Sequence, residues 1–279
     1  MRTTVVPASS LGLSGDGDHH LAGVLPSTPR LAVVGSRAAH RRFRDAVEPI
    51  VQAAARRGFS IVSGGAVGID ADAHAAALAA GVPQVAVLPC GPDKPYPPQH
   101  QPLFEAIVES GHSAVLHARP PGTVPTRAMF ASRNALVVGL VDAVVVVEAA
   151  ARSGTMITAT VARRRGKARA AVVGSAGAAV LVARGAHALP WECGEPARLC
   201  RATEQWLRAV ADDTVLAPPP AVAWPPHLGW LHDALADAGE RGVSVDALPS
   251  PRAALMDLTE AQTLGLVTEL GPGRYVRAG

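Results

Sequence analysis

Glycines, hydroxyls and arginines occur together at several points where an apolar run gives way to a polar segment. Gly35, Ser36 and Arg37 combine a backbone that can approach a ligand closely with a hydroxyl and with a guanidinium suited to bidentate phosphate contact. The segment 63–70 reads Ser-Gly-Gly-Ala-Val-Gly-Ile-Asp, and its glycines permit a nest of backbone N–H groups that favours an anion. We therefore predict a phosphate site that includes Ser63, Gly64, Gly65 and Gly68. The alternative is an ordinary strand-to-helix turn with a solvated Arg37.

Two later segments add polar groups to this candidate site. Arg133 and Asn134 form a polar pair in an otherwise apolar helical stretch, where they either bind a ligand or hold neighbouring loops in place. Ser153, Gly154 and Thr155 open a further helix with hydroxyls and free N–H groups, and such helix N-termini favour anions. Ordinary capping of that helix by one of the hydroxyls is the alternative.

Residues that could support catalysis are few and isolated. Asp70 and His74 are four positions apart on one helical face, so they could form an acid/base pair or half a metal site. No further ligands cluster nearby, which favours an aspartate at a helix start with a histidine bonded to it or to a neighbouring loop. Cys90 has no histidine partner in the sequence. We predict no catalytic residue and no metal site. No G-x-G-x-x-G fingerprint follows the first strand candidate, so NAD is disfavoured.

The elements that position these residues follow an α/β pattern. From Arg30 to about Asp213, short β-branched runs alternate with Ala-rich helical stretches, which is typical of a parallel sheet covered on both faces. The strand candidates are 31–34, 59–62, 84–88, 113–116, 143–147 and 170–173, and examples of the helices are 40–57 and 70–80. We predict a Rossmann-like, open, mostly parallel sheet with helices on both faces. Ligands of such sheets bind at the carboxyl ends of the strands, where the loops described above would meet.

The flanking regions differ from this core. Residues 1–25 are a Ser/Gly/Asp/His mixture and are expected to form a flexible tail ahead of a domain at 26–213. Residues 214–225 are Pro-rich and indicate a linker. Beyond it, helix candidates at 228–238 and 251–264 precede a hairpin candidate at 266–270 and 274–277, so residues 226–279 are predicted to form a small winged-helix-like domain.

Charge and composition limit the classes of partner that the chain is expected to bind. Residues 226–279 hold four arginines and seven acidic residues, a balance of −3 in a chain of net charge +3, so the remainder carries +6. A basic larger domain favours a polyanion partner there. Aromatic residues are only 4% of the chain, so we expect little stacking on bases. Three cysteines without a C-x-x-C pair indicate a reducing, cytoplasmic setting, and the absence of a long apolar run argues against a membrane partner.

The order of these motifs resembles the DprA/Smf family. The matching patterns are V-G-S-R at 34–37, S-G-x-A-x-G-I-D-x-x-A-H at 63–74, A-V-L-x-x-G-x-D-x-x-Y-P-P at 86–98, R-N at 133–134 and V-V-V-E-A-x-x-x-S-G-[ST]-x-I-T-A at 145–159. The resemblance covers about 31–189 and implies a non-enzymatic, homodimeric, cofactor-free protein that binds and protects single-stranded DNA and helps to load RecA in natural transformation and recombination. It also implies a set of crevice residues: Gly35, Ser36, Arg37, Gly64, Gly68, Asp70, His74, Arg133, Asn134, Ser153, Gly154 and Thr158.

Departures from the family pattern leave other functions open. Val67 and Ala135 stand where family members often carry a basic residue, and fewer phosphate contacts would lower affinity and its salt dependence. One alternative is a nucleotide-hydrolysing enzyme like the nucleoside-monophosphate phosphoribohydrolases, although residues 148–155 do not reproduce their P-G-G-x-G-T-x-x-E loop. A nucleotide-sensing module of the same superfamily is the other.

Overall fold

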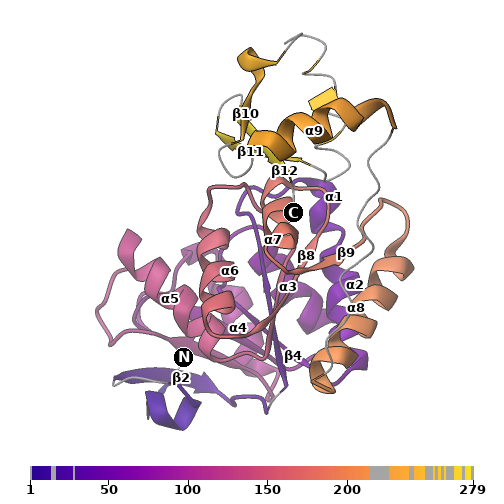
Figure 1. Ribbon diagram of the computed structural model, residues 1–279. Coiled ribbons are helices and arrows are strands. Elements are labelled where there is room, and N and C mark those ends of the chain that lie inside the picture. The colour runs from indigo at the N-terminus through magenta and orange to yellow at the C-terminus, as the bar shows by residue number, and fades with distance from the viewer. Residues whose placement is uncertain are drawn as a thin grey trace.

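The computed structural model describes residues 2–13, 17–27, 29–213, 226–238 and 242–248, together with 254, 257–258, 261, 267–271 and 274–277. A sheet lies among the helices of the larger part of the chain (Figure 1). It has nine strands in the order β1-β2-β6-β5-β4-β3-β7-β8-β9. The last seven strands in this order, β6, β5, β4, β3, β7, β8 and β9, run parallel to one another. Their bounds are β3 Arg30–Val34, β4 Ser60–Ser63, β5 Gln84–Leu88, β6 Ala114–His117, β7 Ala143–Val146, β8 Ala168–Val172 and β9 His187–Leu189.

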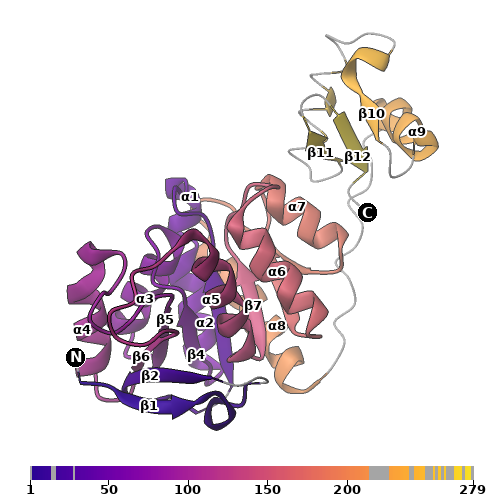
Figure 2. The ribbon, with the colours of Figure 1, turned by 90° about the vertical axis from the view of Figure 1, so that its left-hand side faces the viewer.

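Helices cover both faces of this sheet (Figure 2). One face packs against α2 (Val47–Arg56), α3 (Ile69–Ala79), α4 (Gln101–Glu109) and α8 (Pro196–Ala211). The other packs against α5 (Arg127–Gly139), α6 (Gly154–Arg164) and α7 (Ala176–Ala183). Every residue of β3 to β7 is buried, which explains their nearly uninterrupted apolar runs. The predicted Rossmann-like α/β class is confirmed.

The predicted helix at 40–57 is two helices. A short α1 (Arg41–Arg44) ends at Asp45, and α2 begins at Val47. Phe43 is the buried residue of α1, whereas its three arginines face outward. Because of this break, the three arginines of α1 form a short basic segment directly after the loop that contains Arg37.

The N-terminal segment is part of the sheet, so the prediction of a flexible tail at 1–25 is wrong. β1 (Thr4–Pro7) pairs with β2 (Asp18–Gly23), and β2 pairs antiparallel with β6, with Leu21 opposite Leu116 (Figure 2). The side chain of Ala22 is completely buried. The polar composition was misleading because strand pairing satisfies backbone groups whatever the side chains are, and one buried face suffices to attach the strand.

The C-terminal segment forms a second, three-stranded sheet with the order β10-β12-β11. The strands are β10 (Val243–Ser244), β11 (Val267–Gly271) and β12 (Arg274–Arg277), and α9 (Gly229–Ala238) contributes Leu231 and Leu235 to their core. Antiparallel pairing of β11 with β12 confirms the predicted hairpin. Most of the predicted helix at 251–264 and all of the linker at 214–225 lie outside the described residues, so the domain boundaries and the winged-helix assignment stay predictions.

Candidate functional site

The loops singled out by the sequence meet at the carboxyl edge of the parallel strands. The backbone N–H of Ile69, after β4, donates to the carbonyl of Ser36, after β3, at 3.3 Å. Thr155 at the start of α6 donates its hydroxyl to the carbonyl of Gly35 at 3.0 Å. Gly68 has a φ of +82°, and a Cβ there would collide with the carbonyls of Ser36 and Arg37. Three segments far apart in the sequence thus form one continuous surface.

Several of the predicted contact residues are occupied within the protein. The hydroxyl of Ser63 donates to the carbonyl of Val33 at 2.7 Å and is fully buried. Gly65 (φ +67°) lies against Leu88 and Phe104, and its carbonyl is 3.0 Å from Nδ1 of His100. These contacts explain the residue types without a ligand.

Arg133 lies beneath the loop after β4. Arg133 is 4% exposed, and its guanidinium donates to the carbonyls of Gly64 and, at 2.9 Å, Val87. A Cβ on Gly64 would overlap this guanidinium, so glycine is required there. Burial lowers the pKa of Arg133, and the charge of Asp70 opposes that shift. The geometry agrees with Arg133 holding loops in place, and contact with a ligand stays a prediction.

Asp70 and His74 are also buried. Burial raises the pKa of the Asp70 carboxyl, while the charge of Arg133 and N–H donation from Ala66 and Gly35 lower it. Nδ1 of His74 lies 2.6 Å from Oε1 of Gln84, and burial lowers the pKa of His74 to about 4. The two side chains thus have separate partners, and neither is placed for acid/base work on a ligand.

The start of α6 is more open. Gly154 is exposed, and a Cβ there would meet open space. The side-chain amide of Asn134 approaches the Gly154 carbonyl at 3.5 Å, so Asn134 supports this loop. The Ser153 hydroxyl has no hydrogen-bond partner among the described residues, whereas Thr158 is buried one turn further along. The Ser153 oxygen is itself buried, so exposed Gly154 is the part of this segment best placed to meet an anion.

An exposed cation lies against aromatic rings at the same edge. The guanidinium of Arg37 is 4.8 Å from the centroid of the Phe130 ring, and it forms no ion pair with any residue that the structure describes. The Phe130 ring meets that of Tyr96 edge-on at 5.6 Å, and Tyr96 is 41% exposed. The expectation of little stacking overlooked these two aromatics, because they follow β5 and begin α5, far in sequence from Arg37. The Tyr-Pro-Pro motif at 96–98 was the feature of the sequence that could have drawn attention to Tyr96.

A buried carboxylate at the end of β7 was also missed. Glu148 accepts from the backbone N–H of His40 at 2.9 Å, and its other oxygen lies 2.5 Å from Nδ1 of the His40 ring. Both carboxylate oxygens are therefore occupied by one residue. Glu148 joins the loop after β3 to the end of β7 and is not a free acid.

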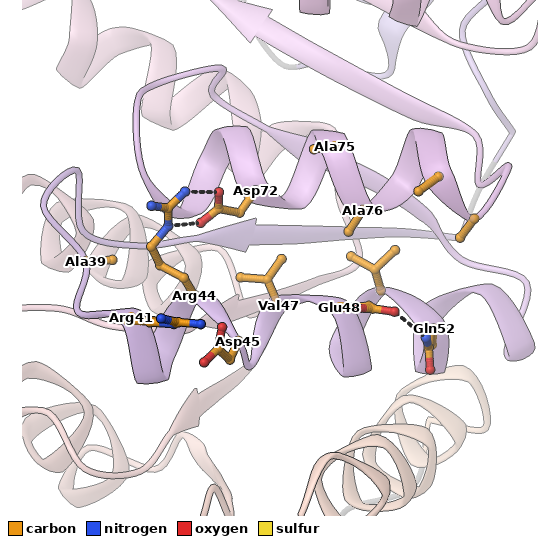
Figure 3. Close-up of a pocket in the computed structure, with 13 residues that line it drawn as sticks. Ala39, Arg41, Arg44, Asp45, Val47, Glu48, Gln52, Asp72, Ala75 and Ala76 are labelled. Atoms are coloured by element: carbon orange, nitrogen blue, oxygen red, sulfur yellow. Dashed lines mark hydrogen bonds and ion pairs between the residues drawn. The ribbon is translucent and has the colours of Figure 1, made fainter. Parts of the chain in front are cut away.

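A groove of about 840 Å³ lies between α2 and α3 (Figure 3). Its floor consists largely of alanine and valine, and Arg44 spans it through two hydrogen bonds to Asp72, at 2.6 and 2.7 Å. Three carboxylates line it against two arginines, so it does not suit a phosphate. Among the residues that the structure describes, no cluster of three potential ligands fits a metal ion.

Fold and site together define a Rossmann-like α/β protein with an exposed arginine and glycine-containing loops at the carboxyl edge of its sheet and without the dinucleotide fingerprint. Comparison with known proteins identifies the family. The sequence profile described as DNA recombination-mediator protein A matches residues 13–204, and the chain belongs to this family, in agreement with its resemblance to DprA/Smf.

Individual relatives agree with this assignment. A DNA processing protein of the DprA type from Mycobacterium tuberculosis is 43% identical over 162 residues, which are 56% of this chain and 41% of that protein. The chain thus matches less than half the length of this relative. The structure of DNA processing protein A from Streptococcus pneumoniae is 32% identical, with a TM-score of 0.60 over 69% of this chain and 65% of that one.

A more distant structure shares the fold. DNA processing protein A from Helicobacter pylori, whose structure concerns its single-stranded DNA binding mode, is 22% identical, with a TM-score of 0.61 over 77% of this chain and 98% of that one. In the part of the present chain that the structure describes, no helix is long and apolar enough to cross a bilayer.

Proposed function

We propose that this chain binds single-stranded DNA along the carboxyl edge of its sheet. In this proposal Arg37 contacts the phosphate backbone, the exposed start of α6 at Gly154 offers backbone N–H groups to a neighbouring phosphate, and Phe130 and Tyr96 contact bases. Of the predicted site residues, Gly64, Asp70, Arg133 and Asn134 then act from beneath by fixing the loops.

The observation that carries this proposal is the group formed by Arg37, Phe130 and Tyr96. Arg37 forms no ion pair with a described residue, so its guanidinium is available to a phosphate, and the ring behind it restricts its motion, so less entropy is lost on binding. The exposed Tyr96 ring and the half-buried Phe130 ring beside a cation provide the kind of stacking surface that sequence-tolerant single-strand binders use. Double-stranded DNA would offer this surface phosphates but no exposed base faces.

The proposal extends to the biological setting that the family suggests. Membership of the DNA recombination-mediator protein A family supports a role in DNA processing during recombination. The Helicobacter pylori relative, described for its single-stranded DNA binding, supports the choice of ligand. We further propose that the chain acts in the cytoplasm as a homodimer, protects the strand and assists RecA loading.

The site favours binding over catalysis. Both oxygens of Glu148 are occupied by His40, and the Asp70 and His74 side chains are buried. Burial raises the pKa of the Cys90 thiol, which disfavours a thiolate nucleophile. The carboxyl, imidazole and thiol groups of Asp70, Glu148, His74 and Cys90 all belong to buried residues.

Fluorescence anisotropy with labelled single- and double-stranded oligonucleotides at several salt concentrations tests the proposal. We expect preferential binding of the single strand, at least about tenfold weaker binding by Arg37→Ala, and a salt slope for that variant smaller by about 0.7. Equal affinity for both forms, or no binding, would overturn the proposal. Release of free base from nucleoside monophosphates would favour the hydrolase alternative.

A further inference from the structure

A second arginine at the carboxyl edge has an environment like that of Arg37. Arg42 in α1 is exposed, and its guanidinium lies 4.6 Å from the centroid of the Phe43 ring. One of its nitrogens donates to the carbonyl of Gly174 at 2.8 Å. The backbone carbonyl of Arg42 accepts from the indole nitrogen of Trp191 at 2.7 Å. Both the backbone and the side chain of this residue are therefore held in place.

The charge of Arg42 is not neutralised by these contacts. A backbone carbonyl and an aromatic ring accept the guanidinium without cancelling its charge, and no carboxylate pairs with Arg42 among the residues that the structure describes. Arg44 in the same helix differs, because Asp72 binds it through two hydrogen bonds (Figure 3). Arg42 is thus better prepared than Arg44 for an external anion.

The residues around Arg42 define a line along the sheet edge. Arg37 follows β3, Gly154 follows β7, Gly174 follows β8, and Trp191 follows β9. β3, β7, β8 and β9 are consecutive neighbours in the sheet. Strands are about 4.8 Å apart, so the loop after β8 lies about 10 Å from that after β3. A few nucleotides of extended single-stranded DNA can span that separation.

We propose that Arg42 is a second phosphate-contacting residue, and that a bound single strand runs from Tyr96, Phe130 and Arg37, past the start of α6, to α1 and the loop after β8. This inference rests on the proposed function and adds to it a direction for the strand and a binding residue. Gly174 has a φ of +108°, a conformation that favours glycine. A Cβ at this position would lie 3.5 Å from the Phe43 ring and 3.6 Å from the Arg42 guanidinium, so this loop borders both groups.

Three substitutions at Arg42 separate its charge from its structural contacts. Arg42→Ala removes both, Arg42→Gln keeps an amide that can donate to Gly174, and Arg42→Lys keeps the charge. In anisotropy titrations with a long oligothymidylate, we expect Arg42→Ala and Arg42→Gln to bind about tenfold more weakly, with salt slopes smaller by about 0.7. Arg42→Lys should keep the wild-type salt slope. Thermal melting of each variant shows whether it is folded.

Arg164→Ala is the matched control. Arg164 is exposed and ends α6, which runs from the carboxyl edge back to the amino edge of the sheet, so its loss should leave affinity and slope unchanged. Wild-type behaviour of Arg42→Gln with weak binding only by Arg42→Ala would overturn the proposal in favour of a structural role. An Arg42 effect on a mononucleotide equal to that on the long strand would overturn the path.

The two proposals fail in different ways. If wild type and Arg37→Ala behave as expected but the Arg42 variants keep the wild-type slope, the path is wrong while single-strand binding stands. If the wild type binds no single strand, both proposals fall.

Discussion

Arg37 and Arg133 differ in what surrounds their guanidinium groups. Arg37 is exposed and rests on Phe130, whereas Arg133 is buried and donates to the carbonyls of Gly64 and Val87. A buried donor that satisfies buried carbonyls stabilises the fold, because its removal leaves those acceptors without partners. An exposed guanidinium adds little stability and is available to a ligand.

Arg133→Met should therefore destabilise the protein by at least about 3 kcal/mol, because two buried carbonyls lose a donor and Asp70 loses the nearby positive charge. Urea unfolding measures this loss. The control is Arg127→Met, an exposed arginine in the same helix, which should change the unfolding free energy by less than about 0.5 kcal/mol. Similar small effects from both substitutions would show that Arg133 is not a structural residue.

At the scale of elements, the N-terminal hairpin closes one edge of the sheet. Without β2, the hydrogen-bonding groups of β6 would be open to other chains. Ala22 in β2 is buried in the cluster that contains Leu88, Phe104 and Val115, so the hairpin contributes to the core as well as to the edge.

Ala22→Asp should lower the free energy of unfolding by at least about 2 kcal/mol, since it places a carboxylate in an apolar cluster. Val5→Asp in β1 is the control, because Val5 is 55% exposed and the substitution should cost less than about 0.5 kcal/mol. Urea unfolding distinguishes the two. Equal, small effects would indicate that residues 1–25 behave as a tail after all.

At the scale of the whole molecule, two buried histidines make stability depend on pH. Burial lowers the pKa of His74 and of His117 from 6.5 to about 4. Between these values the unfolded chain binds more protons than the folded one, so the stability that is present above pH 6.5 is lost as the pH falls towards 4.

Each of these histidines should reduce the free energy of unfolding by about 2 kcal/mol between about pH 7 and about pH 5. Urea unfolding of wild type and of His74→Leu at both pH values tests this. His74→Leu lowers stability at both pH values by removing the bond to Gln84, but its further loss on acidification should be smaller than that of wild type. Parallel pH dependence in the two proteins would contradict a neutral buried His74.

The sequence by itself determined the class of fold and the positions along the chain of six of its parallel strands. Six β-branched runs separated by helical stretches are a local signal, and all six coincide with strands in the core of the sheet. The glycines and hydroxyls after those runs also identified the loops of the carboxyl edge, because parallel strands bring their carboxyl ends together.

Only the tertiary structure decided which of those residues face a ligand. Arg37 and Arg133 look alike in a sequence, and burial alone assigns one to the surface and the other to the interior. The rings of Phe130 and Tyr96, the Phe43 ring under Arg42, and the pairing of β2 with β6 join segments that are distant along the chain. Such contacts depend on strand order and helix packing, which no local pattern of residues encodes.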